Sequence, residues 1–195
     1  MKAPLRFCLC FSIICLTAAI AKPGETYKIN PAQSSVTFSI HQFLGLTHGK
    51  FTQLTGTVEI DRTHLERSSV EAVIVVKSID TGIRKRDEHL QSADFFDVAK
   101  YSQITFKSRS VKQTGPQTGD VLGDLTMHGV TKPITLHVKL LTPLQAANDM
   151  SQTRWAVRPD PIRRSDFGLL FSAGAEVISG IGQDVTAEIS IEATR

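Results

Sequence analysis

Histidine and cysteine are the residue types whose spacing would first reveal a metal site or a nucleophile. The histidines are scattered along the chain, without the H-x-H or H-E-x-x-H spacing of common metal sites. They are His41, His48, His64, His89, His128 and His137. The cysteines, Cys8, Cys10 and Cys15, all lie in the first segment of the chain. The sequence therefore predicts no metal site and no thiol chemistry in the main domain.

One further motif could suggest catalysis, and it lacks the context that catalysis requires. Asp166-Phe167-Gly168 spells the DFG of protein kinases, but the chain has no glycine-rich phosphate loop and no H-R-D or V-A-I-K motif. A serine hydrolase would need a G-x-S-x-G elbow, which is also missing from the sequence. The sequence therefore predicts a protein that is not an enzyme and that needs no cofactor.

The positive charge of the sequence, taken by itself, does not indicate a nucleic-acid or membrane-binding surface. Arg84-Lys85-Arg86 is followed directly by Asp87 and Glu88, which indicates the solvated start of a helix. The formal charge of +3 includes Lys2 and Arg6 in the first segment, and falls to +1 without them. A nearly neutral domain predicts no nucleic-acid partner.

The first residues have the order of a secretory signal. Lys2 and Arg6 precede the uncharged run 7–20, and Ala19-Ile20-Ala21 has the small-x-small pattern of a cleavage site. We expect residues 1–21 to be a cleaved signal peptide, and residues 22–195 to form one exported domain.

Alternation of apolar and polar residues dominates the chain after the signal. The pattern predicts strands, and these strands would position the residues of any binding site. The alternating runs are 36–40, 58–60, 70–76, 104–106, 121–127, 134–140, 155–157 and 185–191. Turn residues such as Gly45, Gly49, Gly129 and Pro143 fall between runs. This pattern predicts an all-β sandwich or barrel. Residues 83–92 are expected to form a short helix, and residues 163–168 a helical turn.

Three ordered motifs resemble the YceI-like family of bacterial periplasmic proteins. They are 78–82 with 86–90 and 94–98, then 123–133, and finally 164–168. The resemblance implies an extended, eight-stranded, antiparallel, lipocalin-like β-barrel with one or two short helices. It also implies an apolar pore that holds a long isoprenoid lipid, such as an isoprenoid quinone or a polyprenyl phosphate, in the periplasm. The implied role is binding, sequestration or transport of that lipid, with transient membrane contact and a homodimer both left open.

Inward-facing apolar residues are the candidates for lining this pore. They are Phe38, Ile40, Phe106, Leu125, Met127, Leu136, Val138, Phe167 and Phe171. Met127 suits such a lining because its flexible thioether adapts to an irregular ligand. His41 and Arg164 are the candidates for contact with a lipid head group, since a guanidinium suits phosphate.

Two alternatives remain open from the residues alone. Alternating apolar rows also suit a barrel whose core is filled, as in a stress-related structural or interaction protein. An enzyme that acts on a bound lipid would need paired titratable groups inside the barrel. A continuous cavity would argue against the first alternative, and the side chains that line it would decide the second.

Overall fold

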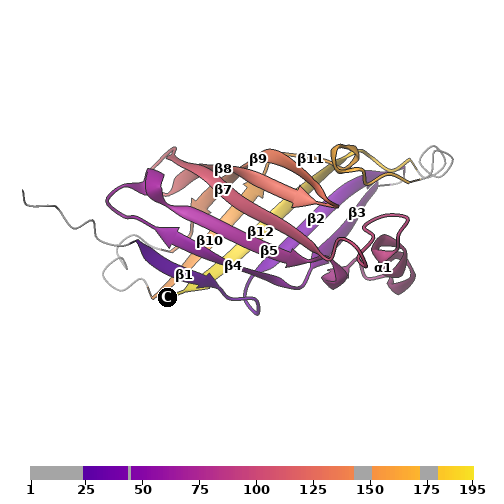
Figure 1. Cartoon of the computed structure of the whole chain (residues 1–195), viewed down its shortest axis with the longest axis horizontal. Helices are drawn as coiled ribbons and strands as arrows, with labels where there is room; N and C mark the ends of the chain where they lie inside the picture. The colour runs from indigo at the N-terminus through magenta and orange to yellow at the C-terminus, as the bar shows by residue number, and fades with distance from the viewer. Residues whose placement is uncertain (1–23, 44, 143–150, 172–179) are drawn as a thin grey trace, which may run out of the picture.

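The fold is an elongated β-barrel with a short helix at one end (Figure 1). The computed structural model describes residues 24–43, 45–142, 151–171 and 180–195. The expected signal peptide, residues 1–21, and the turn expected at Pro143 lie outside these residues. Within the described residues, no helix is both long enough and apolar enough to cross a membrane.

Eight of the described strands close the barrel through antiparallel pairing. They are β1 (Glu25–Ile29), β4 (Leu54–Ile60), β5 (Ser69–Val75), β7 (Gln103–Gln113), β8 (Thr118–Met127), β9 (Val130–Leu140), β10 (Gln152–Pro159) and β12 (Asp184–Thr194). Each pairs with the next in this order, and β1 closes the ring by pairing with both β4 and β12. Closure leaves these strands without free edges. The all-β, eight-stranded antiparallel barrel expected from the sequence is confirmed.

Three further strands lengthen the wall at one end. β2 (Ser35–Gln42) continues β1 along the chain, and β3 (Gly45–Phe51) precedes β4 with only a short break. β12 pairs with β2, β2 with β3, and β3 with the two-residue β6 (Ile79–Asp80). The result is an extension of the barrel wall toward the helix, visible at the right of Figure 1.

The helical segments gather mainly at this same end, which we call the helix end. α1 (Arg84–Gln91) occupies most of the stretch 83–92 that the sequence predicted to be helical. A 3-10 helix (Arg164–Phe167) forms the helical turn expected within 163–168, directly after the short strand β11 (Ile162–Arg163). Two shorter 3-10 helices, Leu65–Arg67 and Val76–Ser78, flank β5.

The β8–β9 hairpin shows how a tight turn sets the register. His128 and Gly129 form its two-residue turn, with φ angles of 51° and 75°. Positive φ at both positions is what such hairpin turns require, and glycine adopts it without strain. The register that follows pairs Leu125 with Lys132 and Val121 with Leu136.

One expectation about turns was wrong. Gly49 was expected between strands, but it lies inside β3 and pairs with Phe38 on β2. The strands β1 and β3 were also missed, because β1 is short and β3 contains two glycines. Gly49 leaves room for the Phe38 ring and does not form a turn.

Candidate ligand-binding cavity

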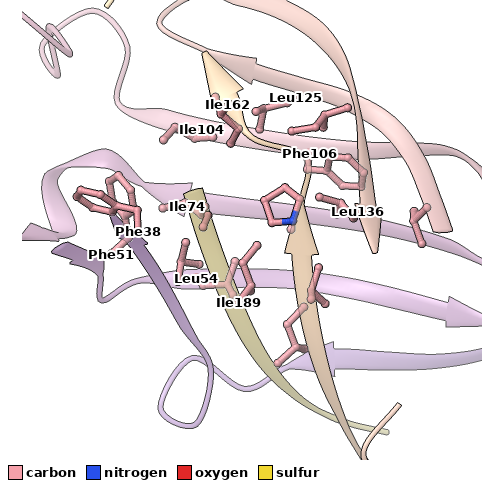
Figure 2. Close-up of a pocket in the computed structure, with 18 of the residues that line it drawn as sticks. Phe38, Phe51, Leu54, Ile74, Ile104, Phe106, Leu125, Leu136, Ile162 and Ile189 are labelled. Atoms are coloured by element: carbon pink, nitrogen blue, oxygen red, sulfur yellow. The ribbon is translucent and has the colours of Figure 1, made fainter. Parts of the chain in front are cut away.

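The barrel encloses a cavity of about 760 Å³. Its walls come from the strands of the barrel and, at the helix end, from α1 and the segments beside it. Figure 2 shows labelled side chains of several strands, among them Phe106, Leu136 and Ile189, pointing into one shared space. Ligand pockets in proteins typically measure about 300–1,000 Å³ and are lined mainly by apolar side chains. The cavity therefore has the size and lining of a site for an apolar ligand.

Several inward-facing apolar residues border an open space and keep accessible surface, whereas others on the lining, such as Leu125, are buried. Leu136 and Val138 alternate on β9 with outward, exposed residues, yet both remain only half-buried. Phe38 and Ile40 on β2 also line the cavity and are also only half-buried. A side chain that borders a filled core would have no accessible surface of this kind.

Two glycines give the large aromatic rings room to lie against the wall. A Cβ atom on Gly49 would sit 2.3 Å from Cζ of Phe38, and one on Gly123 would sit 2.4 Å from Cζ of Phe106. Real side chains do not approach this closely, so only glycine permits these ring positions. Each ring therefore lies over a glycine of the neighbouring strand and leaves more of the bore open.

Aromatic rings form a continuous cluster at the helix end. Phe38 lies 5.5 Å from Phe51, and Phe51 lies 6.3 Å from Phe96, measured between ring centroids. Phe96 then contacts Phe95 at 5.1 Å, and Phe95 stacks on Phe171 at 4.7 Å. Offset and edge-to-face contacts of this kind favour a rigid arrangement. The cluster forms the apolar lining at this end of the cavity.

Arg164 is the most deeply buried charged residue of this end, with 2% of its surface exposed. Its Nε donates to the carbonyl oxygen of Gly182 at 2.9 Å, and its Nη1 donates to that of Leu169 at 2.8 Å. The guanidinium also lies 5.4 Å from the centroid of the Phe171 ring, within cation–π range. Arg164 thus ties together two segments that line the cavity, and it borders the cavity itself.

Arg86 is a second cation on the cavity lining, and it was missed as a site candidate. Its Nε donates to Oγ1 of Thr81 at 2.7 Å, and its Nη2 donates to the Thr81 carbonyl at 2.9 Å. Oδ1 of Asp87 accepts hydrogen bonds from both the backbone N and Oγ1 of Thr81. These bonds hold the start of α1 against β6. The signal was present in the motif 86–90, but spacing alone did not show which side chain faces the cavity.

The opposite end of the cavity carries a different polar group. Arg62, which lines the cavity, donates from Nε to Glu25 at 2.9 Å and from Nη2 to the Tyr27 hydroxyl at 3.2 Å. The Tyr27 hydroxyl in turn donates to Glu25 at 2.6 Å. Burial raises the pKa of Tyr27, while the hydrogen bond from Tyr27 is the main cause that lowers the pKa of Glu25. This network fixes Arg62 beside β1 rather than leaving it free to enter the bore.

The structure places most of the sequence-based candidates on the cavity. The candidates that line it are Phe38, Ile40, Phe106, Leu125, Met127, Leu136, Val138, Phe171 and Arg164. Phe167 is buried in the apolar cluster instead, because it lies on a 3-10 helix where strand alternation does not apply. His41 is exposed and falls outside the lining, because its position on β2 faces the opposite way from Phe38 and Ile40. A role of these residues in binding stays a prediction.

The titratable groups on the lining do not form a catalytic pair. Among the described residues, the ionisable side chains that line the cavity are Arg62, Arg86, His89 and Arg164, and no carboxylate joins them. The part of the chain that the structure describes also contains no group of three or more His, Cys, Asp or Glu residues suited to a metal ion. The lining therefore offers apolar contact and positive charge rather than an acid–base pair.

Comparison with known proteins agrees with this architecture. The YceI-like domain family matches residues 27–193. The chain belongs to the YceI-like family. Among its relatives is the protein YceI of Escherichia coli O157:H7, which is 41% identical over 137 residues, covering 68% of this chain and 70% of the relative. The three motifs that resembled the YceI-like family are thus part of a true relationship.

Solved structures show the same fold. BcnA of Burkholderia cenocepacia superimposes with a TM-score of 0.75 at 24% identity, covering 85% of this chain and 99% of BcnA. A polyisoprenoid binding domain from Saccharophagus degradans, implicated in plant cell wall breakdown, gives a TM-score of 0.61 at 22% identity. That match covers 86% of this chain and 97% of the domain. At these identities the likeness establishes the YceI-like barrel and nothing finer.

Proposed function

We propose that this protein binds a long isoprenoid lipid in its barrel and sequesters or transports it in the periplasm. The observation that carries the proposal is the cavity of about 760 Å³, whose lining is almost entirely apolar. The polyisoprenoid binding of a YceI-like neighbour with the same fold supports the choice of ligand class. The order of residues 1–21, typical of a secretory signal, supports the location.

Burial of the isoprenoid tail does not by itself make the lipid prefer the protein to a membrane. A chain of about 40 carbons, at about 0.8 kcal/mol per methylene, gains roughly 30 kcal/mol when it leaves water. This exceeds the practical affinity limit of about 20 kcal/mol, and a membrane hides the same chain almost as well. A net preference for the protein must therefore come from fit and from polar contacts.

The helix end is the end of the cavity that we propose for the head group. Arg164 and Arg86 both border the cavity there, and each is held by hydrogen bonds to protein oxygens. A guanidinium is suited to a phosphate or to a quinone oxygen because it presents several N–H donors in one plane. The tail then extends along the bore toward Arg62. We expect weak selectivity for tail length and a measurable dependence on the head group.

The filled-core alternative is not favoured, because the inner apolar rows border an open space. The enzyme alternative gains no support from the described lining, whose ionisable side chains are three arginines and one histidine. Binding is thus the function that the geometry supports best.

The direct test is organic extraction and mass spectrometry of the protein purified from the periplasm without detergent. We expect about one isoprenoid lipid per chain. A matched pair of variants on β9 then tests the cavity itself. Val138→Trp places a large ring in the bore, whereas Lys139→Trp places the same ring on the outer face.

The inward variant should lose most of the bound lipid while the outward variant keeps it. Absence of lipid from the purified protein, followed by no uptake of added ubiquinone or undecaprenyl phosphate, would overturn the proposal. Equal lipid loading in both tryptophan variants would place the lipid outside the barrel.

A further inference from the structure

Four large apolar side chains are exposed at the helix end of the barrel. Phe43 is 79% exposed, Leu46 51%, Ile83 53% and Leu170 49%. They come from separate segments: the β2–β3 hairpin, the residue before α1, and the loop after the 3-10 helix at Arg164–Phe167. We call these four residues the apolar rim. Exposed apolar groups gathered in one region mark interaction surfaces, either with proteins or with membranes.

The rim borders the cavity. Phe43 follows Gln42, Leu46 precedes Thr47, and Leu170 follows Leu169, while Ile83 lies two residues after Thr81. The cavity-lining neighbours in these pairs are Gln42, Thr47, Leu169 and Thr81. Each exposed apolar side chain is thus within two residues of the lining. A surface that contacted the rim would lie next to this end of the cavity.

Positive charge accompanies the rim at its α1 side. Arg84 and Lys85 directly follow Ile83, and both are exposed, Arg84 with 91% of its side chain accessible. Arg84 pairs with Glu88 at 3.5 Å, and an exposed pair of this kind contributes little to stability. Cations beside exposed apolar groups suit the anionic head groups at a membrane surface.

The opposite end of the barrel lacks this combination in the described residues. The lining residues Arg62 and Gln113 are followed there by the exposed polar residues Thr63 and Thr114. Beyond the rim, the exposed large apolar side chains in the described part of the chain are Leu122 and Leu141. Leu122 points outward from the middle of β8, and Leu141, which follows the lining residue Leu140, is the one exposed large apolar side chain described at this opposite end.

We infer that the apolar rim docks the helix end of the barrel on a phospholipid bilayer, so that a lipid passes between bilayer and cavity without crossing water. The inference rests on the proposed function, because an isoprenoid lipid resides in membranes. A bilayer accommodates apolar side chains that project from separate loops, and its anionic head groups complement Arg84 and Lys85. Docking at this end brings the aromatic cluster and Arg164 closest to the membrane.

The test is flotation with vesicles of phosphatidylethanolamine and phosphatidylglycerol, compared with vesicles of phosphatidylcholine alone. The variant Leu46→Ser/Ile83→Ser removes half of the rim, and Leu122→Ser/Leu141→Ser is the matched control. We expect the wild type and the control to bind the anionic vesicles with affinities within twofold of each other. The rim variant should bind at least tenfold more weakly, and transfer of ubiquinone from the vesicles into the protein should slow in parallel.

Lipid loading from a diluted detergent solution separates this inference from the proposed function. We expect the rim variant to take up ubiquinone from detergent as the wild type does, since its cavity is unchanged. A protein that loads from detergent yet binds no vesicles would overturn the docking inference and leave the proposed function standing. Vesicle binding without any lipid loading would overturn the proposed function, and with it the lipid transfer, and would leave the rim only as a membrane-docking surface. A wild-type dimer that becomes a monomer in the rim variant, measured by light scattering, would assign the rim to a second copy and overturn docking.

Discussion

The inner and outer faces of the barrel wall are made by the same strands and have opposite chemistry. On β9, Leu136 and Val138 border the cavity, while His137 and Lys139 between them are exposed. The outer face carries ion pairs across neighbouring strands, such as Lys107–Glu71 and Arg109–Asp124, each at 2.7 Å. The inner face carries apolar side chains, glycines and a few arginines that are fixed by hydrogen bonds.

The difference shows where this fold is sensitive. Exposed ion pairs contribute about 0–1 kcal/mol each and tolerate replacement. On the inner face, each side chain must fit a wall that curves around a cavity. A single added atom there can clash with a neighbouring strand or ring. We therefore expect a substitution to change stability or lipid binding more when the side chain faces the cavity than when it faces solvent.

The largest effect is expected at Arg164. The substitution Arg164→Met leaves the carbonyl oxygens of Gly182 and Leu169 without these donors in a buried setting. We expect it to lower the free energy of unfolding by about 3 kcal/mol, since buried acceptors that lose charged donors are costly. Urea denaturation measures this. Arg109→Met, which removes an outer-face pair, should cost less than about 1 kcal/mol. Equal losses in the two variants would contradict the comparison.

Gly56→Ala should have the next largest effect. A Cβ atom at Gly56 would sit 2.3 Å from the carbonyl oxygen of Glu71, a backbone atom of the adjacent strand β5. The strands β4 and β5 would have to separate, so we expect a loss of about 1–3 kcal/mol in the free energy of unfolding. Thermal and urea denaturation both report it. An unchanged stability would mean that the strands move apart at no cost.

Gly49→Ala should cost less stability and change binding instead. The three atoms nearest to its Cβ would all belong to the Phe38 ring, which is a side chain and can turn away into the cavity. We expect a stability loss below about 1 kcal/mol, with lipid affinity weakened by about tenfold, a free energy of about 1.4 kcal/mol. Titration with ubiquinone measures the affinity. If lipid binding stays at the wild-type level, the position of the Phe38 ring does not limit the bore.

Much of the inner face could be predicted from the sequence, because alternation states directly which residues share a side of a strand. Alternation puts Phe38, Leu125 and Leu136 on the inner side of their strands, and all three border the cavity. It failed at Phe167, which lies on a 3-10 helix, where two-residue periodicity has no meaning. At His41 the alternation itself pointed outward, and only proximity to the end of the strand suggested a role.

The remaining features depend on side-chain contacts, two of them between segments far apart in the chain. Gly49 was predicted as a turn because glycine is common in turns, and its true role requires Phe38 of the paired strand. Arg86 faces the cavity because it donates to Thr81, which in turn donates to Asp87, and residue spacing alone does not show these bonds. The apolar rim arises only when the β2–β3 hairpin, α1 and the loop at Leu170 meet at one end of the barrel.

The smallest predicted effect lies on the outer face, at His137. Its Nδ1 lies 2.8 Å from Asp120 and its Nε2 3.1 Å from Asp160, and the hydrogen bond with Asp120 is the main cause that raises the pKa of His137. A raised pKa stabilises the fold fully at pH values below about 6.5, the pKa of an unfolded histidine, and this contribution disappears as the pH rises through the folded pKa.

The substitution His137→Gln should therefore reduce stability more at pH 6 than at pH 8, relative to the wild type. Urea midpoints at the two pH values measure the difference, and an NMR titration of the ring gives the direction of the pKa shift. We expect the effect to be slight, because solvent and salt screen an exposed pair, and to shrink further at high salt. A difference between wild type and variant that does not change with pH would show that the two aspartates act on His137 as hydrogen-bond partners without charge. A loss of stability in His137→Gln as large as that in Arg164→Met would contradict the expected difference between the inner and outer faces of the wall.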